Sequence, residues 1–149
     1  MPHDRIVKIA DQDTNDLEKA KYFGDENGLP CTWAVGIAGR RMDHTIGNIY
    51  RAMNLKLNIA CADSIFEPIC DNIRLRLKKS SDISIFSLDE DNIIKSNGLV
   101  WPLDKIRKWR PYTGTLNRTN KIEITITAKK TAYVFYHLKD LYTRQKGVK

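Results

Sequence analysis

The chain has 149 residues, a net charge of +7 at pH 7 and an isoelectric point near 9.4. Hydrophobic residues make up 42% and charged residues 29%, which excludes a mainly disordered, collagen-like or low-complexity chain and predicts one globular domain. No apolar run approaches the roughly 20 residues that a membrane-spanning helix needs, and the opening residues do not resemble a secretory signal.

The first half of the sequence predicts alternating strands and helices. Asp43 is a candidate N-cap for the clearest helix. Its apolar residues recur on one face, at Ile46, Ile49, Tyr50 and Met53. The elements expected in chain order are a short strand over 5–10, a helix over 13–23, a buried strand over 31–39, a helix over 43–53 and a strand over 55–60.

The second half is dominated by period-two alternation, which is typical of strands with one buried face. It predicts strands over 73–78, 83–87, 121–127 and 131–138, with a short helix over 103–109 behind Pro102. The turn composition at 79–82 predicts a hairpin between the first two of these strands, and the last two are expected to pair, although 131–138 would also suit a helix. Strands outnumber helices, so we expect an α+β fold, with a mainly antiparallel sheet packed against a few helices in a single domain.

Charge is unevenly distributed along the chain. Residues 1–30 are net acidic and are expected to form a flexible or self-association arm, followed by a globular domain over 31–149. The apolar anchors of the arm would be Leu17, Tyr22, Phe23 and Leu29.

Basic residues cluster in the rest of the chain and predict contact with anionic surfaces. On one strand face, Arg74, Arg76 and Lys78 would lie about 7 Å apart, close to the spacing of phosphates along a nucleic-acid strand. Around Trp109, bases would combine charge with a ring that can stack. A solvated basic surface is the alternative reading. The candidate binding residues are Arg40, Arg41, Arg51, Arg74, Arg76, Lys78, Lys79, Lys105, Arg107, Lys108, Arg110, Lys129 and Lys130.

No catalytic constellation stands out in the sequence. Asp43 and His44 are neighbours that would point about 100° apart on a helix, which favours a capping carboxylate beside an exposed histidine. The three cysteines lack metal-type spacing and predict a reduced, intracellular protein. Residues 36–40 lack the spacing of a phosphate-binding loop. We therefore expect a protein that is not an enzyme and has no cofactor, metal or catalytic residue. The alternative hypothesis that the protein is an enzyme depends only on scattered histidines and cysteines.

Two stretches resemble the matrix proteins of rhabdoviruses. The first runs from Trp33 through Gly36, Gly39 and the two following arginines to a helix and Lys56, and resembles the family's order of strand, basic turn and helix. The second runs over 110–127, where Arg-Pro-Tyr leads through a glycine to an alternating strand. The net acidic start without Pro-Pro-x-Tyr is more similar to the plant-infecting branch.

This resemblance implies a structural matrix protein that self-associates, condenses the nucleocapsid and links it to the envelope during assembly and budding. Its implied partners are the nucleoprotein–RNA complex, the anionic inner leaflet of the membrane, other copies of itself and the viral glycoprotein tail. Its implied locations are the virion, the host cytoplasm, the inner face of the membrane and the nucleus. The alternative hypothesis is a small basic nucleic-acid-binding accessory protein, such as a silencing suppressor.

Overall fold

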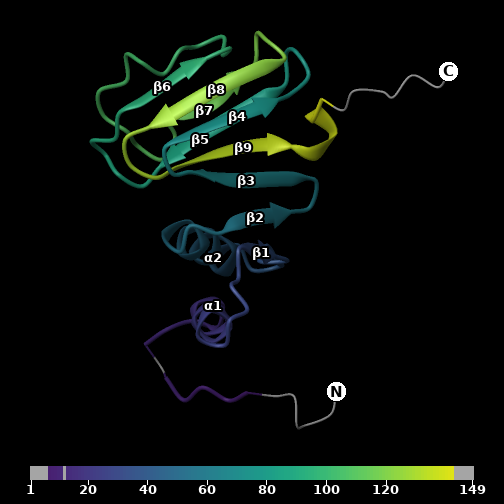
Figure 1. The fold of residues 1–149 in the computed structure, drawn as a ribbon, viewed down its shortest axis with the longest axis vertical. Coiled ribbons are helices and arrows are strands. Elements are labelled where there is room, and N and C mark those ends of the chain that lie inside the picture. Colours follow the sequence, from purple (N-terminus) through teal and green to yellow (C-terminus); the bar gives the residue numbers. More distant parts are fainter. Residues whose placement is uncertain (1–6, 12, 143–149) are drawn as a thin grey trace, which may run out of the picture.

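A computed structural model describes residues 7–11 and 13–142 and combines two β-sheets with two α-helices (Figure 1). The elements are α1 (Asp16–Glu26), β1 (Trp33–Val35), α2 (Met42–Asn54), β2 (Asn58–Cys61), β3 (Ser64–Ile69), β4 (Asn72–Arg76), β5 (Asp82–Ser87), β6 (Ile94–Asn97), β7 (Gly114–Arg118), β8 (Glu123–Ala128), β9 (Ala132–His137) and the 3-10 turn η2 (Leu138–Asp140).

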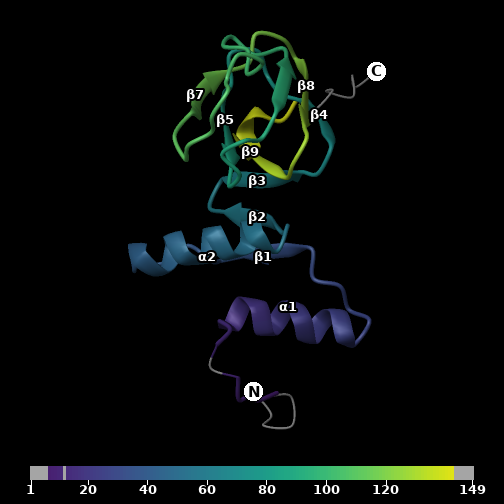
Figure 2. The same ribbon diagram turned by 90° about the vertical axis from the view of Figure 1, so that its left-hand side faces the viewer.

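The larger sheet has the strand order β1-β2-β3-β9-β5-β7, and the smaller one has the order β4-β8-β6. Only the β1–β2 pair is parallel, whereas the other named pairs are antiparallel. The small sheet stacks over the β9-β5-β7 part of the larger one (Figure 2). Between them lies the main core, where Ile69, Ile85, Ile126 and Val134 are fully buried. The alternation of apolar residues along these strands is what lets two sheets share one core.

The other end of the larger sheet is a β1–α2–β2 crossover. A parallel pair needs such a crossover, and α2 packs on one face of the sheet around a second core cluster that includes Ala52, Leu57 and Ile59. The Tyr133 hydroxyl, from β9, donates to the carbonyl oxygen of Leu57 at 3.0 Å. A central strand of the sheet is thereby tied to the chain just after α2.

Helix α1 begins with a capping box. Asn15 accepts from the amide of Glu18, and the Glu18 carboxylate accepts from the amide of Asn15. The other oxygen of that carboxylate lies 2.9 Å from the guanidinium of Arg51, which joins α1 to α2. Neither α1 nor any other helix in the described part of the chain has the length and apolar character needed to cross a membrane.

The structure confirms the α+β class with mostly sheet and two helices, but several predicted elements are wrong. Residues 7–10 form no strand, and the remainder of the strand predicted over 5–10 lies outside the described residues. The strand predicted over 31–39 is only three residues long, and its buried residue is Ala34 rather than Trp33 and Val35. The N-cap of α2 is Arg41 rather than Asp43. No helix forms over 103–109, and the strands β3, β6 and β7 were not predicted.

Both predicted strand pairings are also wrong. Strand β4 pairs with β8 and strand β5 pairs with β9 and β7, so the expected hairpin partners lie in different sheets. Strand β9 is confirmed as a strand but pairs with β3 and β5 rather than with β8. Local turn composition could not reveal these partners, because each one lies tens of residues away in the sequence.

Candidate functional site

A cleft of about 330 Å³ opens beside the exposed indole of Trp101, and we call it the Trp101 cleft. The indole is 57% exposed, which is unusual for a tryptophan in a well-packed domain. The cleft is lined by Trp101, Pro102, Leu103, Ile106, Thr113, Thr115, Leu116 and Asn117. Its walls come from the loop between β6 and β7 and from β7 itself, at the edge of the larger sheet.

The side chain of Asn117 fixes the loop that carries the indole. Its Oδ1 accepts from the amide of Trp101 at 3.2 Å, and its Nδ2 donates to the Trp101 carbonyl oxygen at 2.7 Å. Asn117 is buried, and both of these hydrogen bonds are partly buried. The exposed ring therefore belongs to a residue whose backbone N–H and carbonyl oxygen are both fixed by hydrogen bonds.

Other polar groups of the Trp101 cleft are also engaged within the protein. Thr115 donates its hydroxyl to the carbonyl oxygen of Tyr112, and the Thr113 hydroxyl accepts from the amide of Arg110. Leu116 is 87% exposed and has a φ of +58°, in the left-handed region that disfavours a branched side chain. The cleft thus offers an aromatic face and apolar walls, with no charged side chain in its lining.

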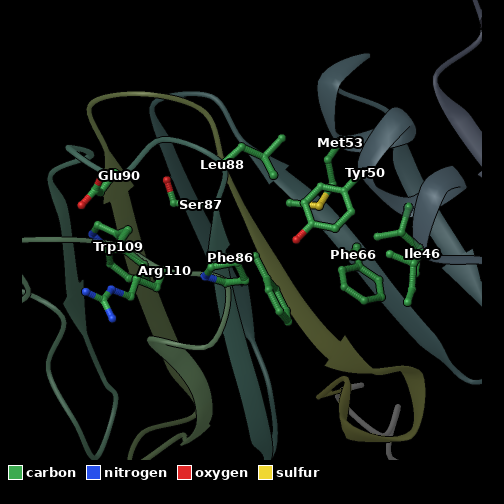
Figure 3. A pocket seen from close by; sticks show the side chains of 12 residues that line it. Ile46, Tyr50, Met53, Phe66, Phe86, Ser87, Leu88, Glu90, Trp109 and Arg110 are labelled. Atoms are coloured by element: carbon green, nitrogen blue, oxygen red, sulfur yellow. The ribbon is translucent and has the colours of Figure 1, made fainter. Parts of the chain in front are cut away.

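A larger hollow of about 510 Å³ lies between α2 and the larger sheet, and we call it the α2 groove (Figure 3). In Figure 3, Ile46, Tyr50 and Met53 of α2 form one side, and Trp109 and Arg110 stand at the opposite end. The rings of Phe66 and Phe86, whose centroids are 5.7 Å apart, lie between these two sides. The complete lining is Ile46, Ile49, Tyr50, Met53, Phe66, Phe86, Ser87, Leu88, Glu90, Trp109, Arg110 and Pro111.

Trp109 is part of the wall of the α2 groove and is only 2% exposed. Its Nε1 is the one buried side-chain nitrogen or oxygen in the described residues that lacks a hydrogen-bond partner. Packing rather than hydrogen bonding therefore holds the ring. The prediction that Trp109 supplies a stacking surface among bases is wrong, because the exposed tryptophan of this region is Trp101. No periodic pattern distinguishes the two rings in the sequence.

The predicted basic residues are distributed over several elements. Arg40 and Arg41 precede α2, Arg51 lies on α2, and Arg74 and Arg76 point outward from β4. The others occupy turns: Lys78, Lys79, Lys105, Arg107, Lys108, Arg110, Lys129 and Lys130.

Several of these bases contact acidic partners. Arg51 pairs with buried Glu18, Arg41 lies 2.5 Å from Asp43, and Arg74 lies 3.8 Å from Glu123. Lys108 and Lys130 pair with Glu90 and Asp89, and the hydrogen bond that Lys108 donates to the Glu90 carboxylate raises the pKa of Lys108. The row of three charges expected on one strand is not formed, because β4 ends at Arg76 and Lys78 turns to the carbonyl oxygen of Lys139.

The predicted self-association anchors have different surroundings. Leu17 packs against the core cluster below α2, whereas Tyr22, Phe23 and Leu29 are 49%, 38% and 69% exposed. Their role in self-association stays a prediction, as does the division of the chain at residue 30. The cysteines Cys31, Cys61 and Cys70 are free thiols.

The chain has an α+β fold in which a short β1–α2–β2 crossover and an antiparallel sandwich share one sheet. Comparisons with known proteins find this fold among the thiamin pyrophosphokinases. The sequence profile described as "Thiamin pyrophosphokinase, substrate-binding domain" matches residues 64–135, just under half of the chain. This range contains the whole lining of the Trp101 cleft. It does not contain α2, so the α2 groove lies partly outside it. A comparison with curated protein sequences finds no significant match.

Solved structures with a similar fold include three thiamin pyrophosphokinases. The Bacillus subtilis protein is 20% identical, with a TM-score of 0.66 over 85% of this chain and 64% of its own. The Geobacillus thermodenitrificans protein is 16% identical, with a TM-score of 0.67 over 92% and 65%. The Candida albicans protein is 11% identical, with a TM-score of 0.59 over 86% and 54%. The chain thus spans less than two thirds of each of these proteins.

These matches contradict the predicted viral matrix protein. The profile match and the similar folds are to thiamin pyrophosphokinases and not to viral matrix proteins, so the resemblance to rhabdovirus matrix proteins was wrong. The accessory nucleic-acid-binding protein and the non-enzymatic role are contradicted by the same finding. The same finding contradicts the predicted nucleoprotein–RNA, membrane and glycoprotein partners and the predicted location in a virion. The two stretches that suggested the resemblance were short and degenerate, whereas the profile match is continuous over 64–135.

Proposed function

We propose that the chain binds thiamine in the Trp101 cleft, as the substrate-binding part of a thiamin pyrophosphokinase. The observation that carries this proposal is the profile match over 64–135, which is described as a substrate-binding domain and includes every residue of the Trp101 cleft. The similar folds of three thiamin pyrophosphokinases support it further. A pyrophosphokinase transfers the β- and γ-phosphates of a nucleoside triphosphate to an acceptor hydroxyl, which loses its proton, and the nucleoside monophosphate leaves. Thiamine carries such a hydroxyl.

The chemistry of the cleft suits this ligand. Thiamine consists of two linked aromatic rings, of which the thiazolium carries a permanent positive charge. The face of an indole attracts a cation, and Trp101 presents such a face on a fixed main chain. The apolar residues Leu103 and Ile106 can receive the uncharged ring, and the volume of about 330 Å³ is within the range of small-molecule sites.

Isothermal titration with thiamine tests the proposal. Replacing Trp101 by alanine removes the aromatic face, and we expect the affinity to fall by about 1–2 kcal/mol, or roughly five- to thirty-fold. Trp33→Ala is the matched control, because Trp33 is 51% exposed but lies on β1, away from the cleft. The proposal is wrong if the unaltered chain does not bind thiamine, or if both variants lose affinity equally.

The transfer itself is tested by incubating the complete chain with thiamine, a nucleoside triphosphate and a divalent cation. Formation of thiamine diphosphate is expected, and it should decrease in Trp101→Ala and persist in Trp33→Ala. Binding without any transfer would restrict the chain's role to holding the substrate.

A further inference from the structure

The α2 groove has the character of a second ligand site. Its volume of about 510 Å³ exceeds that of the Trp101 cleft, and its lining is aliphatic and aromatic except at one end. Two of the residues that α2 contributes remain open to solvent: Ile46 is 51% exposed and Tyr50 is 42% exposed. Apolar walls of this size left open in a folded chain mark a place where a ligand or partner binds.

The shape of the α2 groove favours a flat ring system. The rings of Phe66 and Phe86 form the floor, tilted by 39° to each other, and neither is fully buried. Tyr50 leans over this floor from α2, with its hydroxyl turned toward the opposite wall (Figure 3). That hydroxyl has no hydrogen bond within the described part of the chain. Aromatic side chains on two sides of a cavity are suited to planar ligands, which they contact by offset or edge-to-face packing.

The charged end of the groove determines the sign of the ligand. Only Glu90 and Arg110 carry charge in the lining, and Glu90 is already paired with Lys108 at 3.2 Å. Arg110 contacts no carboxylate among the described residues. Its Nη1 donates to the hydroxyl of Tyr112, and its other side-chain N–H groups have no hydrogen-bond partner among the described residues. A free guanidinium is a donor fork for carboxylate, sulfonate or phosphate oxygens.

From this arrangement we infer that the α2 groove binds a small aromatic anion, with the ring system between α2 and the phenylalanine floor and the acidic group at Arg110. This site is separate from the Trp101 cleft. The two also differ in charge, because one is proposed to receive a cation on an indole and the other an anion on a guanidinium. Thiamine should therefore not compete for the α2 groove.

The fluorescent probe 8-anilinonaphthalene-1-sulfonate is an aromatic anion, and N-phenyl-1-naphthylamine is the same ring system without the sulfonate. We expect the complete chain to bind one equivalent of the anionic probe. Arg110→Gln should weaken that binding about tenfold and change the binding of the uncharged probe less than twofold. Arg107→Gln, which removes an exposed base of the same loop outside the groove, is the matched control.

Two further variants separate this inference from the proposed function. Ile46→Asp places a charge on an exposed position of the groove wall, and it should weaken both probes without affecting thiamine. Trp101→Ala should weaken the binding of thiamine and leave the binding of both probes unchanged. Displacement of the anionic probe by 2-naphthoate or by 2-naphthyl phosphate then distinguishes a carboxylate ligand from a phosphate ligand.

Three results would overturn the inference. One is binding of several probe molecules that Ile46→Asp does not change. Another is equal loss of the anionic probe in Arg110→Gln and Arg107→Gln. The third is binding of the uncharged probe alone, which would make the groove a docking surface for an apolar protein segment. Hydrogen exchange over 42–54 gives an independent readout, since a bound probe should slow exchange in α2 and leave α1 unchanged.

Discussion

The side-chain amide of Asn117 makes two hydrogen bonds with the backbone of Trp101: it accepts from the N–H and donates to the carbonyl oxygen. The two residues are 16 positions apart and belong to different segments, yet a single buried side chain satisfies both polar groups of the Trp101 main chain. Direct contact with substrate is proposed for Trp101, and Asn117 is a positioning residue that acts through it.

Asn117→Ala should therefore affect stability and binding together. Two partly buried backbone groups would lose their partners, and we expect the free energy of unfolding to fall by about 1–3 kcal/mol. Thiamine affinity should fall as well, because the indole would no longer be held. Urea denaturation and titration calorimetry measure the two effects. Asn120→Ala is the control, since the side chain of exposed Asn120 makes a single hydrogen bond, to the carbonyl oxygen of Leu99, and its loss should have a smaller effect on both measurements.

Leu116→Gly should stabilise the protein. The left-handed φ of +58° costs a leucine about 1–2 kcal/mol, whereas glycine adopts it freely. The side chain is 87% exposed, so little packing is lost. After the greater chain entropy of glycine in the unfolded state is included, we expect a gain of roughly 0.5–1 kcal/mol in urea denaturation. Leu116→Ala keeps the strain and should give no gain; a gain of equal size would show that the backbone is not the cause.

Two glycine-to-alanine changes should change the free energy of unfolding in opposite directions. A Cβ on Gly114 would lie 2.4 Å from the carbonyl oxygen of Ile85 and 2.8 Å from Cζ3 of Trp109, so Gly114→Ala should destabilise the protein by about 1–3 kcal/mol. A Cβ on Gly47, inside α2, would meet no atom within 4 Å. Gly47→Ala should raise the free energy of unfolding by about 1 kcal/mol through helix propensity alone. Thermal and urea unfolding of the two variants check this contrast.

Stability should decrease at alkaline pH because of two buried tyrosines. Burial is the main cause that raises the pKa of Tyr133 and of Tyr136 above the ordinary value of 10.0. A folded-state pKa above the unfolded one means that the neutral form is favoured by folding. This contribution is fully present below pH 10 and is lost as pH rises from there toward the folded-state pKa.

Urea midpoints measured between pH 8 and pH 11 should show this decrease. The double variant Tyr133→Phe/Tyr136→Phe should have a flatter profile in that range, although it is less stable at neutral pH because the bond from Tyr133 to Leu57 is lost. An unchanged alkaline slope in the double variant would contradict the assignment.

The sequence predicted individual elements better than their arrangement. The alternation at Ile124 and Ile126 identified β8, and the stripe through Ile46 and Met53 identified α2, because both patterns arise from a local period. Strand β3 was missed because Glu67 and Pro68 interrupt its alternation. Pairing between strands depends on contacts across tens of residues, which no local pattern records.

The candidate sites were less accessible from sequence than the fold. Basic residues were the most visible feature, but Lys108, Lys130 and Arg51 are partners of carboxylates in the folded chain. The Trp101 cleft depends on Asn117, a polar residue of β7, where the sequence predicted no strand. The α2 groove depends on how far α2 stands from the phenylalanine floor, which is a tertiary distance without a sequence signature.

The position of β9 has a consequence for how the protein is made. This strand is the last one described along the chain, yet it lies between β3 and β5 in the middle of the larger sheet. During translation, β3 and β5 emerge from the ribosome long before the segment that must join them. Their inward edges stay without hydrogen-bond partners until residues 132–137 have been synthesised. Folding of this part of the sheet therefore waits for that segment, and until then the open edges of β3 and β5 can pair with other strands.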